Sequence, residues 1–145
     1  MAYTKKWKAG NGIARPGRGA MTGTEQIDYL EFAAADLEAT KAFFVDAFGW
    51  TFTDYGPDYV DSPSGGPMVG FYRAEGATRQ ENGGAVVGFY SDDLAGSQAR
   101  VEAAGGTILK PVYAFPGGRR FHFLEPSGNE FIVYAILGDE DAVPA

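Results

Sequence analysis

Two ionisable side chains in otherwise apolar runs are the first candidates for chemistry in this sequence. His122 is the single histidine and lies in the run FHFLE, and Glu31 lies in the run YLEFAAA. An imidazole titrates near neutral pH and can transfer a proton, and a carboxylate is seldom buried without a partner. The sequence therefore predicts an acid–base or ligand-facing role for both. The structural alternatives are a histidine satisfied by a neighbour and an ion pair between Glu31 and Arg119 or Arg120.

An internal repeat supplies the elements that must position these residues. Residues 27–35 alternate in the manner of a strand, Asp36 suits the N-cap of a following helix, and Gly49 suits its stop. At the 57-residue shift that separates Asp36 from Asp93, the same pattern returns, and Gly106 takes the place of Gly49. Both halves continue into three β-prone runs, so each half is predicted to be strand–helix–strand–strand–strand.

The repeat predicts an α+β fold of two βαβββ modules, at residues 27–73 and 85–137, joined by a polar, glycine-containing linker at 74–84. We expect the modules to form a curved, barrel-like mixed sheet around one cup, with the helices outside. Residues 25–145 then make a single two-module domain. Residues 1–24 are basic and without period, and we expect a flexible arm there.

Composition and charge exclude several classes of function. The 145 residues contain no cysteine, which leaves neither disulfides nor thiolate metal sites. Residues 1–24 hold five basic residues. This segment suits an extension upstream of a true start at Met21, and the alternative is an arm that binds nucleic acid or a protein partner. Residues 25–145 hold the other seven basic and all nineteen acidic residues, a net charge of −12 that argues against nucleic acid as the main ligand. No apolar run is long enough to cross a membrane, and we expect a cytoplasmic protein.

Strand alternation separates the expected core from the expected ligand site. Leu30 and Phe32 are predicted to face the helix, and Tyr29 and Glu31 the opposite side. Tyrosines on that side can stack on a ring or donate a hydroxyl, with simple filling of the barrel as the alternative. The predicted ligand-binding set shares the cup-facing side: Tyr29, Glu31, Val86, Gly88, Tyr90, Arg120, His122, Ile132 and Tyr134.

Three segments in this order carry a family resemblance: YLEFAAADLEATKAFFVDAFGW (29–50), SDDLAGSQARVEAAGGTIL (91–109) and FHFLEPSGNEFIVY (121–134). They resemble the vicinal-oxygen-chelate superfamily, which includes glyoxalase I, bleomycin- and fosfomycin-resistance proteins and extradiol dioxygenases. The glyoxalase-related single-chain proteins are the most similar subgroup. The resemblance implies the two-module fold and a two-fold homodimer, in some members with exchanged modules.

The resemblance also implies where a metal would be held in metal-using members, at one position in each quarter of the fold. Those positions fall on Tyr29, Val86, Ile132 and a place near 69–71, which lack the imidazole and carboxylate groups that divalent metals prefer. We therefore expect no metal and no cofactor. A relocated metal held by Glu31 and His122 is the alternative.

These observations predict a protein that binds a small, partly apolar or aromatic molecule in a metal-free cup, oriented by Glu31, His122 and Arg120. The alternative is a lyase, isomerase or epimerase in which Glu31 or His122 transfers a proton. A third possibility is a module that acts through protein contacts, with its cup filled by its own side chains. The expected partners are a small molecule and a second copy of the chain, without nucleic acid or membrane.

Overall fold

The computed structural model describes residues 24–136. The arm predicted at 1–24 lies outside these residues except for Thr24, and so does Leu137, the last residue of the predicted second module. No helix in the described part is long and apolar enough to cross a membrane.

The first module contains one helix and one four-stranded sheet. Its strands lie in the order β1-β4-β3-β2, with β1 parallel to β4 and the other neighbours antiparallel. The elements are β1 (Tyr29–Ala34), α1 (Leu37–Phe48), β2 (Thr53–Asp54), β3 (Tyr59–Ser62) and β4 (Met68–Arg73).

The second module repeats this plan after a linker that contains the 3₁₀ turn η1 (Gln80–Asn82). Its strands lie in the order β5-β8-β7-β6, again with only the first pair parallel. The elements are β5 (Val87–Tyr90), α2 (Leu94–Ala103), β6 (Thr107–Phe115), β7 (Gly118–Leu124) and β8 (Glu130–Ile136). The predicted α+β fold of two βαβββ modules is therefore confirmed.

The N-caps of both helices are as predicted. The Asp36 carboxylate accepts a hydrogen bond from the backbone N–H of Ala39 at 3.1 Å, and the Asp93 carboxylate accepts one from Gly96 at 3.0 Å. Each bond satisfies one of the N–H groups that a helix leaves unpaired in its first turn. The repeated Asp-Leu pair thus starts both helices in the same way.

The helix ends differ between the modules. Gly49 has a φ of 70° and ends α1 as predicted. After α2 the left-handed residue is Gly105, with a φ of 99°, so the predicted stop at Gly106 is displaced by one residue. Gly106 serves packing instead, because a Cβ there would lie 2.7 Å from the Val101 side chain and 2.9 Å from that of Phe43.

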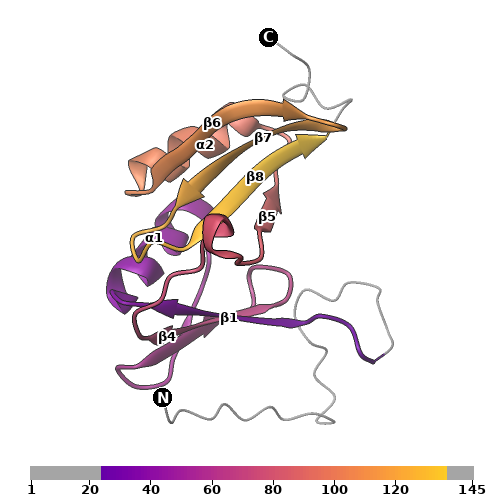
Figure 1. The fold of residues 1–145 in the computed structure, drawn as a ribbon. Helices are drawn as coiled ribbons and strands as arrows, with labels where there is room; N and C mark the ends of the chain where they lie inside the picture. Colours follow the sequence, from indigo (N-terminus) through magenta and orange to yellow (C-terminus); the bar gives the residue numbers. More distant parts are fainter. Residues whose placement is uncertain (1–23, 137–145) are drawn as a thin grey trace.

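The two sheets share one core, built from their helix-facing sides. The Phe32 ring of β1 lies 5.1 Å from the Phe131 ring of β8, and Phe44 of α1 lies 5.3 Å from Phe71 of β4 and 5.5 Å from Phe131. Helix α1 therefore lies between the two sheets, as Figure 1 shows, rather than outside both. Within residues 24–136 no ladder joins the sheets, which remain two curved sheets and do not close into a barrel.

The β7–β8 loop fastens the second module to the first. Asn129 Nδ2 donates to the Ala33 carbonyl at 2.8 Å, and Asn129 Oδ1 accepts from the linker N–H of Thr78 at 2.7 Å. The Thr40 hydroxyl of α1 donates to the buried Glu125 carboxylate at 2.6 Å. The predicted turn at Gly128 is present, with a φ of 94°. These buried bonds fix how the second sheet sits on α1.

Candidate functional site

On the first sheet, the predicted ligand-facing residues lie opposite the core. Phe32 is buried against Phe71, whereas Glu31 is exposed and accepts a hydrogen bond from the Tyr29 hydroxyl at 2.9 Å. The Tyr29 hydroxyl also contacts that of Tyr59. This side of the sheet therefore presents one exposed carboxylate held by a phenol.

On the second sheet, the side opposite the core carries a connected chain of polar groups. His122 Nδ1 lies 2.7 Å from a Glu130 carboxylate oxygen, and His122 Nε2 lies 2.8 Å from the Tyr113 hydroxyl. Arg120 Nε donates to the same hydroxyl at 2.5 Å. His122 is fully buried, Glu130 is nearly so, and Tyr113 and Arg120 are half-buried. The chain thus runs from a buried carboxylate to a half-buried tyrosine and arginine.

The charges fix the direction of the hydrogen bonds. Burial alone would raise the pKa of Glu130, but the Gln80 N–H, which donates to it at 2.9 Å, the His122 hydrogen bond and the His122 and Lys110 charges together lower that pKa. An ionised carboxylate can only accept, so His122 Nδ1 carries a proton. When the imidazole is neutral, Nε2 accepts from the Tyr113 hydroxyl, whose oxygen accepts from Arg120.

Arg120 is held as a fixed cation. Its guanidinium carbon lies 5.4 Å from the centre of the Tyr113 ring and 5.3 Å from that of Phe115, both within the range of a cation–π contact. No carboxylate in the described residues forms an ion pair with it. The remaining guanidinium N–H groups are therefore suited to a carboxylate or another planar anion.

Apolar and aromatic side chains complete this side of the second sheet. Ile132 lies across from both His122 and Gly88 in the strand register, and the Tyr90 and Tyr134 rings meet edge to face at 5.7 Å. Tyr90 is half exposed. We call Gly88, Tyr90, Tyr113, Arg120, His122, Ile132 and Tyr134 the second-sheet face.

The single chain does not unite the whole predicted set. Among residues 24–136, no hydrogen bond, ion pair or ring contact links Tyr29 or Glu31 to the second-sheet face. Glu31 is bound to Tyr29 and not to Arg119 or Arg120. Val86 precedes β5 and so lies outside the strand that was predicted to point its side chain toward the cup.

Sequence reasoning missed Tyr113 and Glu130. The register between β6 and β7 is irregular: Lys110 pairs with His122, but Tyr113 pairs with Arg120, so three residues of β6 span two of β7. Counting by twos from one strand therefore could not place Tyr113 beside His122. Glu130 carried a usable signal, because it lies two residues before Ile132 and so on the same side of β8.

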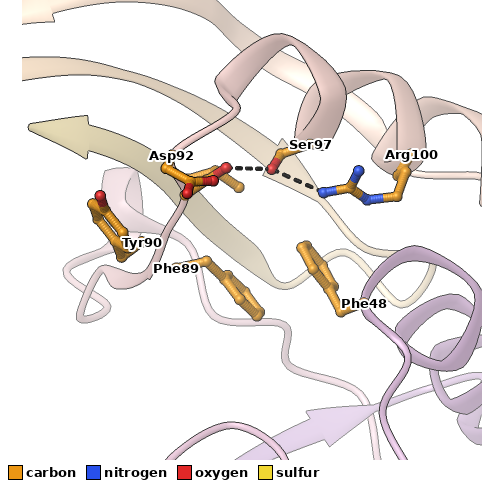
Figure 2. A pocket seen from close by; sticks show the side chains of 8 residues that line it. Phe48, Phe89, Tyr90, Asp92, Ser97 and Arg100 are labelled. Carbon is orange, nitrogen blue, oxygen red and sulfur yellow. Dashed lines mark hydrogen bonds between the residues drawn. The ribbon is translucent and has the colours of Figure 1, made fainter. Parts of the chain in front are cut away.

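A pocket of about 280 Å³ lies elsewhere, between the C-terminal end of α1, the β5–α2 loop and α2. Figure 2 shows its Phe48 and Phe89 rings, which are stacked 4.2 Å apart, with Arg100 reaching in from α2. An Arg100 N–H donates to the Ser97 hydroxyl at 3.3 Å. Of the predicted ligand residues, Tyr90 alone lines this pocket.

The comparisons with known proteins decide the family. Residues 26–133 match the model of the Glyoxalase/Bleomycin resistance protein/Dioxygenase superfamily. The chain belongs to this superfamily. No curated protein matches the sequence.

Solved structures show the same fold. A glyoxalase/bleomycin resistance protein/dioxygenase family enzyme from Burkholderia phytofirmans PsJN is 17% identical, with 78% of this chain and 100% of that one covered and a TM-score of 0.65. A glyoxalase-related enzyme from Fulvimarina pelagi is 22% identical, covers 83% and 99%, and also has a TM-score of 0.65. The fosfomycin resistance protein FosX from Mesorhizobium loti is 17% identical, covers 77% and 92%, and has a TM-score of 0.62. At these identities the likeness concerns the fold alone.

The side chains at the superfamily's metal positions do not fit a metal site. Val86 and Ile132 have no donor atom, and the Tyr29 phenol is engaged with Glu31 and Tyr59. The described residues contain no group of three or more histidine and acidic side chains that could hold a metal ion. We therefore derive no chemistry through a metal.

Proposed function

We propose that this protein binds a small, partly apolar or aromatic anion on the second-sheet face, without a metal. The observation that carries the proposal is Arg120, a cation placed by two rings and by the Tyr113 hydroxyl, and left without a carboxylate partner in residues 24–136. A guanidinium fixed in this way binds an anion with little loss of side-chain freedom.

The neighbours of Arg120 favour a ligand with a ring or an alkyl body. Ile132 lies near the middle of this face, and the Tyr90–Tyr134 pair offers an aromatic edge on the same side. Tyrosine rings supply a large contact area at low entropic cost, and their hydroxyls can bond polar substituents. A planar carboxylate with an aromatic body satisfies both kinds of surface.

A thermal-shift experiment tests this proposal. Benzoate should raise the melting temperature of the protein, because a native-state binder stabilises the fold by mass action. Its uncharged analogue benzamide is the control and should raise the melting temperature less. Arg120→Gln should weaken benzoate binding about 10- to 100-fold, the effect of a lost charge-assisted hydrogen bond of about 1.5–3 kcal/mol. Equal shifts with benzamide, or an unchanged response in Arg120→Gln, would contradict the proposal.

Arg100→Gln is the matched control for the location of the ligand. Arg100 also presents a guanidinium beside aromatic rings, but in the pocket of Figure 2. If benzoate binds on the second-sheet face, Arg100→Gln responds as the wild type does. Loss of the response in Arg100→Gln and not in Arg120→Gln would move the site to that pocket.

The metal-free part of the proposal has its own test. Elemental analysis of protein purified without chelator should find well below one equivalent of Zn, Ni, Fe or Mn per chain. Benzoate binding should also survive dialysis against EDTA. A stoichiometric metal that is lost together with binding on chelation would overturn this part.

We also propose that the ligand site is closed by a second copy of the chain in a homodimer. Glu31 is exposed on the first sheet, and Arg120 lies unpaired with any described carboxylate on the second, so the two sides are complementary in charge. Large apolar side chains remain exposed on the second module, at Tyr90, Leu109 and Ile136. Two-fold pairing of unlike faces would bring Tyr29 and Glu31 against the second-sheet face of the partner. Light scattering should give twice the chain mass of 15.5 kDa, and a monomer at tens of micromolar would contradict this.

A further inference from the structure

We infer that Tyr113, His122 and Glu130 form a hydroxyl–imidazole–carboxylate triad in which the Tyr113 oxygen attacks the carbonyl carbon of a small carboxylic ester. The inference rests on the proposed function for the position of the ester, beside Arg120. It assigns to this site an acyl-transfer activity, with a nucleophile that sequence analysis did not single out.

The three groups have the arrangement that nucleophilic catalysis by a hydroxyl requires. The Tyr113 hydroxyl lies 2.8 Å from His122 Nε2, within reach for direct proton transfer. His122 Nδ1 lies 2.7 Å from Glu130, whose other oxygen is fixed by the Gln80 N–H. The imidazole is therefore held in the tautomer that presents its free nitrogen to the hydroxyl. Such triads are defined by geometry and roles, whatever the fold or the order of the residues.

Burial divides the triad into a sealed part and an accessible part. His122 is 0% exposed and Glu130 4%, so water does not compete for the bond between them. Tyr113 is half-buried on β6, so it is the member of the triad that solvent reaches. Arg120 adjoins that oxygen and has N–H groups left to stabilise negative charge on a reacting carbonyl.

The proposed step balances in atoms and charge. The Tyr113 oxygen forms a bond to the carbonyl carbon while its proton passes to His122 Nε2, and the bond from that carbon to the alkoxide or phenolate of the ester breaks. An alkoxide takes the proton from Nε2, whereas a phenolate leaves as the anion and Nε2 gives its proton to solvent. In the second half, water attacks the acyl-tyrosine and gives a proton to Nε2. The Tyr113 oxygen then departs and recovers that proton. The imidazolium that forms within each half is stabilised by Glu130, and the imidazole is neutral between the halves.

4-Nitrophenyl acetate is a suitable probe, because its reaction is visible and leaves a mass label. Incubation with the full chain should release 4-nitrophenolate and place one acetyl group on Tyr113, identified by peptide mass spectrometry among the eight tyrosines. Tyr113→Phe should abolish the label at this position and the associated release. Tyr72→Phe, which removes a half-buried phenol on β4, should react as the wild type does.

Two further variants separate a triad from an incidentally reactive tyrosine. His122→Asn should slow acetylation about 100-fold, the lower range of a general base. Because His122 is buried, Glu130→Gln is the gentler change: it keeps the shape and a hydrogen bond to the imidazole, and should slow acetylation at least about tenfold. Unchanged rates in both variants, or acetyl groups on lysines with Tyr113 unmodified, would overturn the inference.

The benzoate experiment distinguishes this inference from the proposed function. Tyr113→Phe keeps Arg120 and both rings that contact it, so it should weaken benzoate binding by less than Arg120→Gln does. Benzoate binding that depends on Arg120, without any acetylation of Tyr113, would refute the triad and leave the binding site standing. Acetylation of Tyr113 without benzoate binding would do the reverse.

Discussion

The two modules have the same backbone plan and different chemistry. In both modules the first strand is parallel to the last strand in chain order, and both helices start at an aspartate N-cap. The side away from the core carries a phenol–carboxylate pair, Tyr29 and Glu31, in the first module. In the second it carries a four-residue chain from Glu130 to Arg120. Residues that build the fold are thus repeated, and those that face away from the core have diverged.

The difference has a physical reason. Residues that make caps, turns and core contacts stabilise the fold in each module, so a change there weakens the whole domain. Side chains on the far side of a sheet contribute little to that core and can change more freely. The function of such a fold is therefore decided by these side chains and not by the topology.

The shared core makes the two modules depend on each other for stability. A substitution in this core has the largest expected effect. Phe44 contacts rings from both sheets. Phe44→Ala should lower the free energy of unfolding by about 3–5 kcal/mol, the cost of a large buried cavity. Urea unfolding followed by tryptophan fluorescence and by far-UV circular dichroism should still give coincident transitions.

The adjacent Val45 is the control for this substitution. Its side chain is 41% exposed, so Val45→Ala should change the free energy of unfolding by at most about 0.5 kcal/mol. Two separate transitions in Phe44→Ala would mean that the modules fold independently, and would contradict the single core.

The loop that fastens the modules should have the next largest effect. Asn129→Ala removes hydrogen bonds to Ala33, Thr78 and Glu125 and leaves buried partners unsatisfied. We expect a loss of about 2–4 kcal/mol in the free energy of unfolding by urea titration. Ser127→Ala, at a more exposed position of the same loop, should cost about 1 kcal/mol. Equal costs would show that the buried asparagine does not fasten the modules.

The polar chain of the second module predicts that the stability of the protein depends on pH. The folded pKa of Glu130 is below its ordinary value of 4.5, so its ionised form stabilises the fold above that pH, and this stabilisation is lost as the pH falls through and below it. Glu130→Gln should therefore be less stable than the wild type by about 1–2 kcal/mol at pH 7. The deficit should shrink below pH 4.5, as measured by urea unfolding across pH. A deficit that stays constant down to about pH 3 would contradict this assignment.

The helix N-caps, which both modules share, have the smallest expected effect on stability. Asp36→Ala and Asp93→Ala each remove one N-cap bond and should each lower the free energy of unfolding by about 1 kcal/mol. Nearly equal values, measured by thermal denaturation, would support a common local role. A much larger cost at Asp93 would show that it acts beyond the cap.

The sequence predicted the features that depend on local chemistry and periodicity. The caps at Asp36 and Asp93, the left-handed glycines at 49 and 128, and the inward direction of Phe32 follow from rules that act over a few residues. The repeat made the two-module fold recognisable because both halves obey these rules in the same register.

The predictions that failed or stayed incomplete depend on geometry between elements. The irregular register of β6 hid the contact between Tyr113 and His122, and the length of α2 placed the left-handed residue at Gly105 instead of Gly106. Alternation assigned Glu31 and His122 each to the cup-facing side of its sheet, opposite the helix, but it says nothing about how two sheets are oriented relative to each other. That orientation is set by the shared aromatic core and the Asn129 loop.

The central claim is that the second-sheet face is the ligand site, and arginine side-chain NMR tests it most directly. In a benzoate titration of protein labelled with ¹⁵N-arginine, the Arg120 Nε–H resonance, identified by its loss in Arg120→Gln, should shift in a saturable manner. The Arg100 resonance should stay in place. Benzoate binding that shifts the Arg100 resonance and leaves that of Arg120 unmoved would contradict the account.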